Sequence, residues 1–188
     1  MTSLQVVGIF WFIFIIYWFV ESFHTKKTVY RHQGMHRVYW AIGVIFVILI
    51  FYFNIFSIEY TQYRLIPTQH IWSVLGVILA FIGISFAMYA RHFLKGNWSS
   101  MVTLKEKHEL IQSGPYAIVR HPIYSGMLLA LLGTAIIIGE LSAFITLIIC
   151  LIVLIYKLRL EEQVLRRHFG EKYDIYMRRV KALIPFLV

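Results

Sequence analysis

Hydrophobic residues dominate the chain in five long runs separated by short polar segments. The runs cover approximately residues 4–20, 38–56, 71–89, 123–138 and 141–156. The first three have the roughly 17–25 residues that a helix needs to cross the hydrocarbon layer of a membrane. The last two are near the lower limit of that length, and only Gly139-Glu140 separates them. So short a joint predicts a tight antiparallel helical hairpin, lying deep in the membrane or tilted.

The composition agrees with an integral membrane protein. The 188 residues are 60% hydrophobic and 14% charged, whereas a soluble domain carries about 25% charged residues. The first run lacks a preceding basic segment and a small-residue cleavage pattern, so we expect a retained span rather than a signal peptide. No repeat or second domain is visible in the sequence. The expected architecture is therefore a single all-α membrane domain over residues 1–188, with about five transmembrane helices.

Basic residues are distributed unequally between the runs. The net charge of +9 is also found in nucleic-acid-binding proteins, but here the charges lie between apolar runs. An anionic membrane surface explains them better, and we expect no nucleic-acid partner. Lys and Arg concentrate in the loops 21–37 and 90–122 and in the tail from Lys157, whereas the loop 57–70 contains only Arg64. The positive-inside rule predicts that these two basic loops and the tail face the cytoplasm, with the N-terminus outside.

A polar, aromatic stretch at residues 114–126 leads straight into the fourth apolar run. Gly114-Pro115 ends whatever element precedes it, and Pro122 suits the first turn of a new helix. At a helix N-terminus, the dipole and the unpaired N–H groups favour an anion. By itself, this stretch is more typical of a membrane boundary without chemistry. The polar residues expected at this N-terminus are Arg120, His121 and Tyr124.

Two further helices are expected on the cytoplasmic side. Thr103-Leu104-Lys105-Glu106 has the pattern of a capping box, which predicts a short helix that ends at Gly114. In the tail, apolar residues at helical spacing predict that the fifth span continues as a helix as far as Gly170.

Two adjacent acidic residues, Glu161 and Glu162, follow the last apolar run. Glu162 precedes Arg166 by four residues, so an ion pair on the helix surface accounts for it. Glu161 follows Lys157 by four residues and can be paired as well. However, an acidic residue beside apolar turns often marks a functional site. The single Cys150 lies in an apolar run, and no Cys/His spacing suggests a metal site.

The ordered set of motifs in residues 90–188 resembles the isoprenylcysteine carboxyl methyltransferase family, which is related to the membrane phospholipid methyltransferases. The short five-span form is similar to its prokaryotic members. The motifs that carry the resemblance are, in chain order, Gly96-Asn97-Trp98-Ser99, His108-Glu109-Leu110-Ile111, Ser113-Gly114-Pro115-Tyr116, Arg120-His121-Pro122-Ile123-Tyr124-Ser125-Gly126, Glu161-Glu162, Phe169-Gly170, Tyr173, Tyr176 and Ile184-Pro185.

The resemblance implies a methyltransferase that uses S-adenosylmethionine. Residues 1–89 would supply three N-terminal spans, and residues 90–188 would bind the cofactor at the cytoplasmic face, between the 114–126 stretch and the tail helix. Arg120 adds positive potential for the carboxylate of the cofactor. The other residues that the resemblance places at the cofactor are His108, Leu110, Ile111, Tyr116, His121, Pro122, Tyr124 and Glu161.

The resemblance also implies a lipophilic acceptor, with O-methylation of an isoprenylcysteine-type carboxylate. Family members often carry an Arg four residues before the equivalent of Glu161, assigned to the substrate carboxylate. This sequence has Lys157 there, with Arg159 nearby, and Lys keeps the charge but lacks the bidentate fork. N- or S-methylation of a phospholipid or another small lipophile is the alternative. An amine acceptor must first lose a proton, and His121 is the expected base.

Two other classes of protein fit parts of the pattern. Membrane sterol reductases have a comparable C-terminal helical region that binds NADPH, whose 2′-phosphate would need several converging Arg or Lys residues. A soluble-type dinucleotide site is excluded because the sequence has no glycine-rich loop. A transporter subunit or other non-enzymatic membrane protein is the third class. Its ionisable residues would line the middle of the spans, whereas here they cluster at one interface. The expected partners are a lipophilic or prenylated acceptor and membrane lipids, with no obligate protein partner evident.

Overall fold

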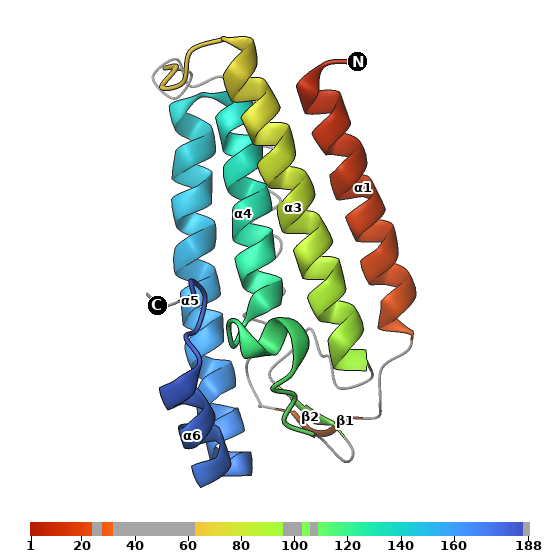
Figure 1. Ribbon diagram of the computed structural model, residues 1–188, viewed down its shortest axis with the longest axis vertical. Helices are drawn as coiled ribbons and strands as arrows, with labels where there is room; N and C mark the ends of the chain where they lie inside the picture. The colour runs from red at the N-terminus through yellow and green to blue at the C-terminus, as the bar shows by residue number, and fades with distance from the viewer. Residues whose placement is uncertain (24–27, 32–62, 96–102, 106–108, 186–188) are drawn as a thin grey trace.

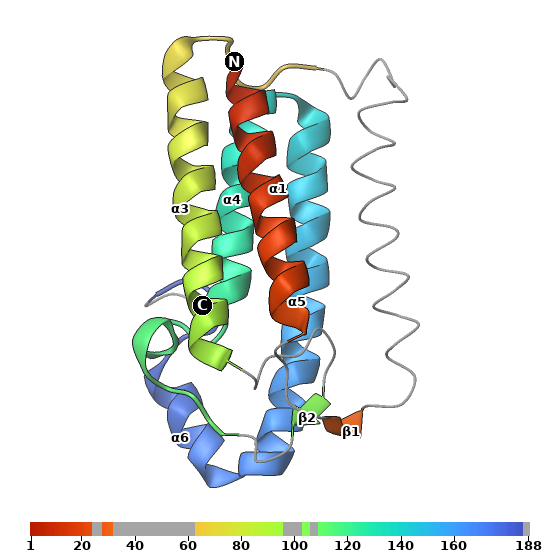
Figure 2. The ribbon, with the colours of Figure 1, turned by 90° about the vertical axis from the view of Figure 1, so that its right-hand side faces the viewer.

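The computed structural model describes residues 1–23, 28–31, 63–95, 103–105 and 109–185. Within these ranges, four long helices lie side by side in one bundle, and short elements gather at one of its ends (Figures 1 and 2). In chain order, the elements are α1 (Ser3–Ser22), β1 (Thr28–Arg31), α3 (His70–Leu94), β2 (Thr103–Lys105), the 3₁₀ helix η3 (Gly114–Ala117), α4 (Pro122–Ile138), α5 (Leu141–Phe169) and α6 (Glu171–Arg179).

The bundle confirms the predicted all-α membrane fold. α1, α3 and α5 are each long and apolar enough to cross a membrane, and α4 is a shorter apolar helix. These helices coincide with the first, third, fifth and fourth predicted spans, whereas the second predicted span (38–56) lies outside the described residues. Large apolar side chains stay exposed along the helices, among them Phe12, Phe81 and Ile152. Such exposure is expected where lipid rather than water surrounds a helix.

Glycine residues allow α3 and α4 to pack backbone against backbone. A Cβ atom on Gly83 of α3 would lie 2.5 Å from the carbonyl oxygen of Gly126 and 2.5 Å from the backbone nitrogen of Ala130 in α4. A Cβ atom on Gly76 would lie 2.6 Å from the carbonyl oxygen of Gly133. Between helices in lipid, such close approach supplies the van der Waals contact that holds them together. This seam therefore fixes the position of α4 against α3.

The predicted hairpin between the fourth and fifth spans is confirmed. Gly139 ends α4 in the left-handed conformation, with φ of 71°, and α5 begins at Leu141. The N–H groups of Leu65 and Ile66, in the segment before α3, donate to the Gly139 carbonyl at 2.8 and 3.1 Å. Residues with a side chain rarely adopt this φ, and a Cβ atom here would lie 2.8 Å from the Arg64 guanidinium. The tight turn therefore requires glycine.

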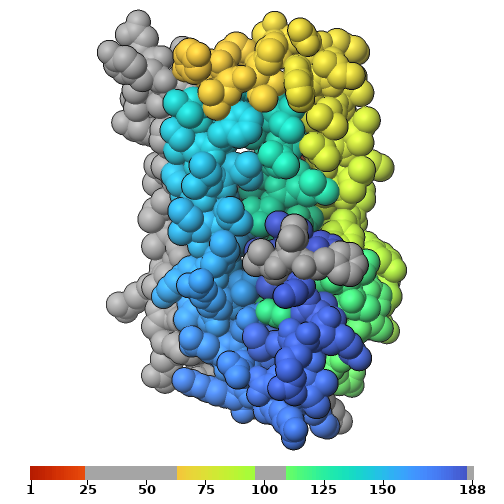
Figure 3. Space-filling model, turned by 60° about the vertical axis from the view of Figure 1, so that its left-hand side comes forward, coloured from red at the N-terminus to blue at the C-terminus, as the bar shows by residue number. Residues whose placement is uncertain are grey.

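α5 continues from its apolar part into the basic tail and ends at Gly170, where φ is 56°, as predicted. α6 then packs back against the end of α5 and buries Tyr173, Tyr176 and the following residue Val180. In the space-filling view, α6 lies between α5 and the green segment that precedes α4 (Figure 3). The tail thus returns to the segment that carries the polar motif.

The predicted helix between Thr103 and Gly114 is wrong. Thr103–Lys105 forms strand β2, which pairs antiparallel with β1 so that Leu104 lies opposite Tyr30. Residues 109–113 are not helical, and η3 begins where the helix was expected to end. A capping box satisfies only local backbone groups. Pairing with β1 satisfies backbone groups of two segments at once, and this tertiary pairing outweighs the local helix signal.

The short elements mark one end of the bundle. The last turns of α1 and α3, the start of α4 and the basic part of α5 lie at the same end as β1, β2, η3 and α6 (Figure 1). The N-terminus and the turn between α4 and α5 lie at the opposite end. The described parts of the two basic loops and the tail therefore share one end, as the charge distribution predicted.

Candidate functional site

Two buried tyrosines fasten the segment before α4 to its neighbours. Tyr116, in η3, donates its hydroxyl to the carbonyl of Ala90 in α3 at 3.4 Å. The carbonyl of Tyr116 accepts from the hydroxyl of Tyr176 in α6 at 2.6 Å. Burial raises the pKa of both tyrosine hydroxyls above the ordinary value. Both groups therefore stay protonated at neutral pH and act as donors.

The segment after α6 presents a row of carbonyl groups to the start of α4. The N–H of Arg120 donates to the carbonyl of Lys181 at 2.8 Å, and the N–H of His121 donates to the carbonyl of Ala182 at 3.0 Å. The Ser125 hydroxyl donates to the next carbonyl along the tail, that of Leu183. We expected donors at this N-terminus to face an anion. The backbone N–H groups of residues 120 and 121, just before the helix, bind the tail of the protein itself, and an anion at the first turn of α4 stays a prediction.

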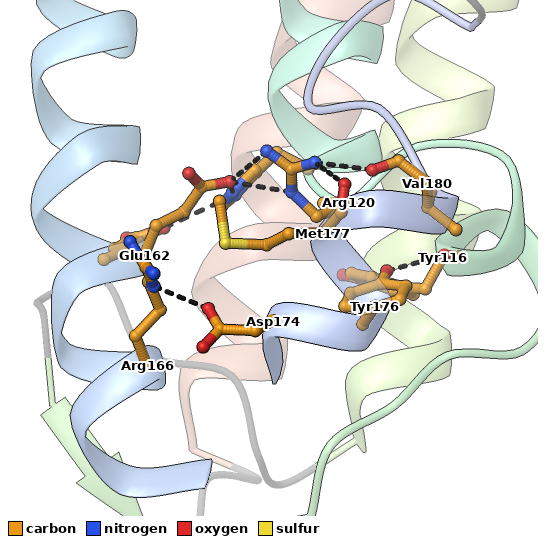
Figure 4. A network of polar contacts seen from close by, with 10 residues as sticks. Tyr116, Arg120, Glu162, Arg166, Asp174, Tyr176, Met177 and Val180 are labelled. Atoms are coloured by element: carbon orange, nitrogen blue, oxygen red, sulfur yellow. Dashed lines mark hydrogen bonds and ion pairs between the residues drawn. The ribbon is translucent and has the colours of Figure 1, made fainter. Parts of the chain in front are cut away.

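The side chain of Arg120 is also engaged by the protein. Its Nε and Nη2 atoms lie 2.8 and 2.7 Å from Oε1 of Glu162 in α5. Its Nη1 atom donates to the carbonyls of Met177 and Val180 at the end of α6 (Figure 4). The Arg120 and Glu162 side chains are only 9% and 12% exposed. Arg120 thus joins α4, α5 and α6, and its role toward a cofactor carboxylate stays a prediction.

His121 lies between two carboxylates of α5. Its Nε2 atom is 3.2 Å from Oε1 of Glu162, and its Nδ1 atom is 3.8 Å from Oε2 of Glu161. The imidazole ring is parallel to the ring of Tyr124, with centroids 5.5 Å apart. The Tyr124 hydroxyl donates to Oε1 of Glu161 at 2.7 Å. The first turn of α4 and the basic part of α5 therefore bring an imidazole, a phenol and two carboxylates into one polar cluster.

Lys157 joins this cluster from one turn earlier in α5. Its Nζ atom lies 3.8 Å from Oε1 of Glu161, which confirms the predicted pairing, and 5.2 Å from the centroid of the Tyr124 ring. The Lys157 and Glu161 side chains are each 19% exposed, whereas that of His121 is 8% exposed. Lys157 and Glu161 are therefore the charged members of the cluster that are more accessible to a ligand.

The other predicted site residues differ in how far they are buried and in what they pack against. Ile111 packs against the apolar cluster around η3 and the first turn of α4, and Leu110 packs against the buried tyrosines of α6. Pro122 is buried in the first turn of α4. Arg159 is exposed and, two residues after Lys157, lies on the opposite face of α5. His108 lies outside the described residues, and all five roles stay predictions.

The predicted ion pair between Glu162 and Arg166 is wrong. Arg166 instead pairs with Asp174 of α6 at 2.7 Å (Figure 4). Glu162 is turned inward because it shares a helical face with the buried Leu158 and with Leu165, which packs against the tyrosines of α6. That spacing was a signal for an inward-facing carboxylate. The row of tail carbonyls had no such signal, because backbone acceptors are the same in every residue type.

Lipid-exposed helices and a buried polar cluster at one end together define an α-helical integral membrane protein with a candidate active site. Among the described residues, no group of three His, Cys, Asp or Glu is placed to hold a metal ion. The chain belongs to the phospholipid methyltransferase family, whose model matches residues 71–172. The matched range contains α4, α5, all but the first residue of α3 and all residues of the polar cluster, and it confirms the predicted family relationship.

Similar proteins carry the narrower name that the motifs suggested. Protein-S-isoprenylcysteine O-methyltransferase B of Arabidopsis thaliana is 28% identical over 123 residues, which cover 63% of this chain and 62% of that protein. Protein-S-isoprenylcysteine O-methyltransferase of Saccharomyces cerevisiae is 30% identical over 118 residues, covering 61% of this chain and 49% of the yeast protein. The chain thus spans about half to three fifths of these curated relatives.

A solved structure shows the same fold. The eukaryotic intramembrane Ras methyltransferase ICMT (isoprenylcysteine carboxyl methyltransferase) superposes with a TM-score of 0.57. The superposition covers 85% of this chain and 55% of that protein, at 22% sequence identity. At this identity the likeness establishes the fold alone.

Proposed function

We propose that this protein is an S-adenosylmethionine-dependent membrane methyltransferase that acts on a lipophilic acceptor. The observation that carries the proposal is that the phospholipid methyltransferase family model covers the whole polar cluster. Within that range, side chains from α4 and α5 converge although the sequence separates them by about 40 residues. The convergence is at one end of the spans, where both a water-soluble cofactor and a lipid-borne acceptor have access.

The residues of the cluster suit the polar groups of S-adenosylmethionine. The Glu161 carboxylate can accept from ribose hydroxyls or from the ammonium group, and its Oε2 atom lies beyond hydrogen-bond distance from His121. The ring of Tyr124 is stacked on His121 and lies beside the Lys157 ammonium, so its contribution is to hold the Glu161 carboxylate in place for the cofactor. Ile111 and Tyr116 supply apolar surface beside Tyr124. When bound, the cofactor supplies a methyl group on an already activated carbon.

We further propose an isoprenylcysteine-type carboxylate as the acceptor, which is the substrate class in the names of the Arabidopsis and yeast relatives. A carboxylate is ionised at neutral pH and needs no general base. Lys157 supplies positive charge for it at the accessible part of the cluster. His121 is held between two carboxylates and orients the first turn of α4. Orientation and exclusion of water would then account for most of the acceleration.

Binding of S-adenosylmethionine and of NADPH to the detergent-purified protein tests the proposed function. We expect calorimetry to detect binding of S-adenosylmethionine and its competition by S-adenosylhomocysteine, with no binding of NADPH. A radiolabelled methyl screen over prenylcysteines, aminophospholipids and thiols then identifies the acceptor, and we expect label on the prenylcysteines. Binding of NADPH alone would replace the methyltransferase with a reductase. Label on an aminophospholipid would retain the enzyme class and reject the carboxylate acceptor.

A further inference from the structure

We propose that Glu162 is a positioning residue, which holds the C-terminal segment 180–183 against the start of α4 through Arg120 and thereby fixes the orientation of His121. The ligand-binding part of this inference rests on the proposed function, whereas the docking of the tail does not. Glu162 lies beside Glu161 in the sequence, and both carboxylates face His121, but Glu162 pairs with Arg120 whereas Glu161 pairs with Lys157.

One oxygen of Glu162 receives three contacts. Its Oε1 atom lies 2.8 Å from Nε and 2.7 Å from Nη2 of Arg120, and 3.2 Å from Nε2 of His121. Contacts between a carboxylate and a guanidinium are charge-assisted and short, and they fix the geometry of both groups. The position of Glu162 therefore determines where two consecutive side chains at the start of α4 point.

Arg120 in turn positions the tail through hydrogen bonds to its carbonyl groups. The guanidinium edge that faces away from Glu162 donates through Nη1 to the carbonyls of Met177 and Val180 (Figure 4). The backbone N–H of Arg120 donates to the following carbonyl, that of Lys181, at 2.8 Å. A side chain and a backbone group of one residue thus hold consecutive carbonyls, which aligns the tail in a single register beside α4.

His121, like Arg120, is held both by its backbone N–H and by its side chain. Its backbone N–H donates to the carbonyl of Ala182 at 3.0 Å, and its ring lies against Glu162 on one side and is stacked on Tyr124 on the other. Without the Glu162 charge, the largely buried guanidinium of Arg120 has no compensating carboxylate and is better solvated by turning toward water. The tail carbonyls and the imidazole would then lose their fixed partners together.

The substitution Glu162→Gln tests this inference in the full-length protein. Hydrogen exchange at the backbone amides of Arg120 and His121 reports docking of the tail, because their acceptors are tail carbonyls. We expect exchange at both amides to accelerate at least tenfold and the Kd for S-adenosylmethionine to rise at least tenfold. We also expect the ¹⁵N signals of the His121 imidazole to shift, which a general loss of stability would not produce.

Asp174→Asn is the matched control, because it removes an ion pair that also joins α5 to α6, but at the exposed Arg166. It should leave the two amides, the imidazole signals and the Kd unchanged. A second variant, Arg120→Lys, keeps the positive charge beside Glu162 but lacks the fork that reaches the tail carbonyls. It should accelerate exchange at His121 as Glu162→Gln does.

The outcomes separate this inference from the proposed function. Unchanged exchange and an unchanged Kd in Glu162→Gln would overturn the positioning role. A higher Kd without faster exchange would also overturn it, since Glu162 would then contact the ligand directly. Faster exchange in a protein that fails to bind S-adenosylmethionine even as wild type would reject the proposed function and retain the docking role. If Glu162→Gln fails to fold, the double variant Arg120→Met with Glu162→Leu replaces the buried ion pair by apolar groups. Faster exchange at the His121 amide in this variant would then support the docking role, and unchanged exchange would overturn it.

Discussion

Glu161 and Glu162 are adjacent, yet helical geometry gives them different environments. Glu161 lies at the accessible part of the cluster with Lys157 and the Tyr124 hydroxyl, whereas Glu162 is turned inward to Arg120 and His121. Successive residues of an α-helix are rotated by about 100°, so one carboxylate can face a ligand while the next faces the protein. We therefore propose that Glu161 binds the ligand and that Glu162 positions its neighbours.

Glu161→Gln should weaken the binding of S-adenosylmethionine at least tenfold without lowering the melting temperature. The change removes a charged acceptor, and a hydrogen bond to a charged group contributes roughly 1.5–3 kcal/mol. Titration calorimetry on the detergent-purified protein measures the loss. Glu171→Gln, at an exposed position of α6, is the control and should bind as the wild type does. Equal affinities of the two variants would contradict a role for Glu161 in binding.

Tyr124→Phe should weaken binding of S-adenosylmethionine several-fold, which is less than the effect of Glu161→Gln. The ring remains stacked on His121, but the hydroxyl that donates to Glu161 at 2.7 Å is lost, so the carboxylate keeps its charge and loses only the partner that orients it. The same titration measures this effect. Tyr156→Phe, at an exposed position of α5, should have no effect. An unchanged Kd in Tyr124→Phe would show that this hydrogen bond does not orient the carboxylate for a ligand.

At the scale of elements, the seam between α3 and α4 connects the fold to the site. The site residues His121 and Tyr124 lie at the first turn of α4, and the contact between Gly83 and Gly126 lies only one turn further along. Since backbone meets backbone there, no flexible side chain can absorb a displacement. Any change that separates the two helices should therefore also move the cluster.

Gly83→Ala should destabilise the protein and weaken cofactor binding. The added methyl group would lie 2.5 Å from backbone atoms of Gly126 and Ala130, so the helices must move apart, at a cost of about 1–3 kcal/mol. Thermal unfolding in detergent should show a lower melting temperature. Gly8→Ala is the control, because a Cβ atom at Gly8 in α1 meets nothing within 4 Å. Equal melting temperatures would mean that α3 and α4 do not pack this closely.

The sequence predicted correctly those elements whose structure is determined by residues within the element itself. Length and hydropathy define the spans, and Gly139 and Gly170 end their helices because they adopt positive φ. The strand at Thr103–Lys105 depends on residues 28–31, which no local pattern reveals. The inward turn of Glu162 follows from its helical spacing with Leu158 and Leu165, whereas its partners Arg120 and His121 are revealed only by the folded structure. At the site, the sequence indicated the participating residues through family motifs, whereas the register of the tail against α4 needed the folded structure.

At the scale of the whole molecule, the bundle has two chemically different ends, and the direction of each helix determines which of its termini lies at which end. α1, α3 and α5 run toward the end that holds the polar cluster, and α4 runs away from it (Figures 1 and 2). The segment before α3 and the N-terminus therefore lie across the bundle from α6. The positive-inside rule predicts that the basic end, which includes the cluster, faces the cytoplasm. A soluble cofactor made in the cytoplasm could then reach the site without crossing the membrane.

Single cysteines at the two ends should react with a membrane-impermeant maleimide from opposite sides. Thr68→Cys, exposed just before α3, should be labelled in intact cells. Lys172→Cys, exposed on α6, should be labelled only after permeabilisation. The native Cys150 is buried within α5 and should stay unlabelled in the wild type, which serves as the control. The reverse pattern would place the cluster outside the cell, and labelling of both positions from one side would contradict the arrangement of the bundle in the membrane.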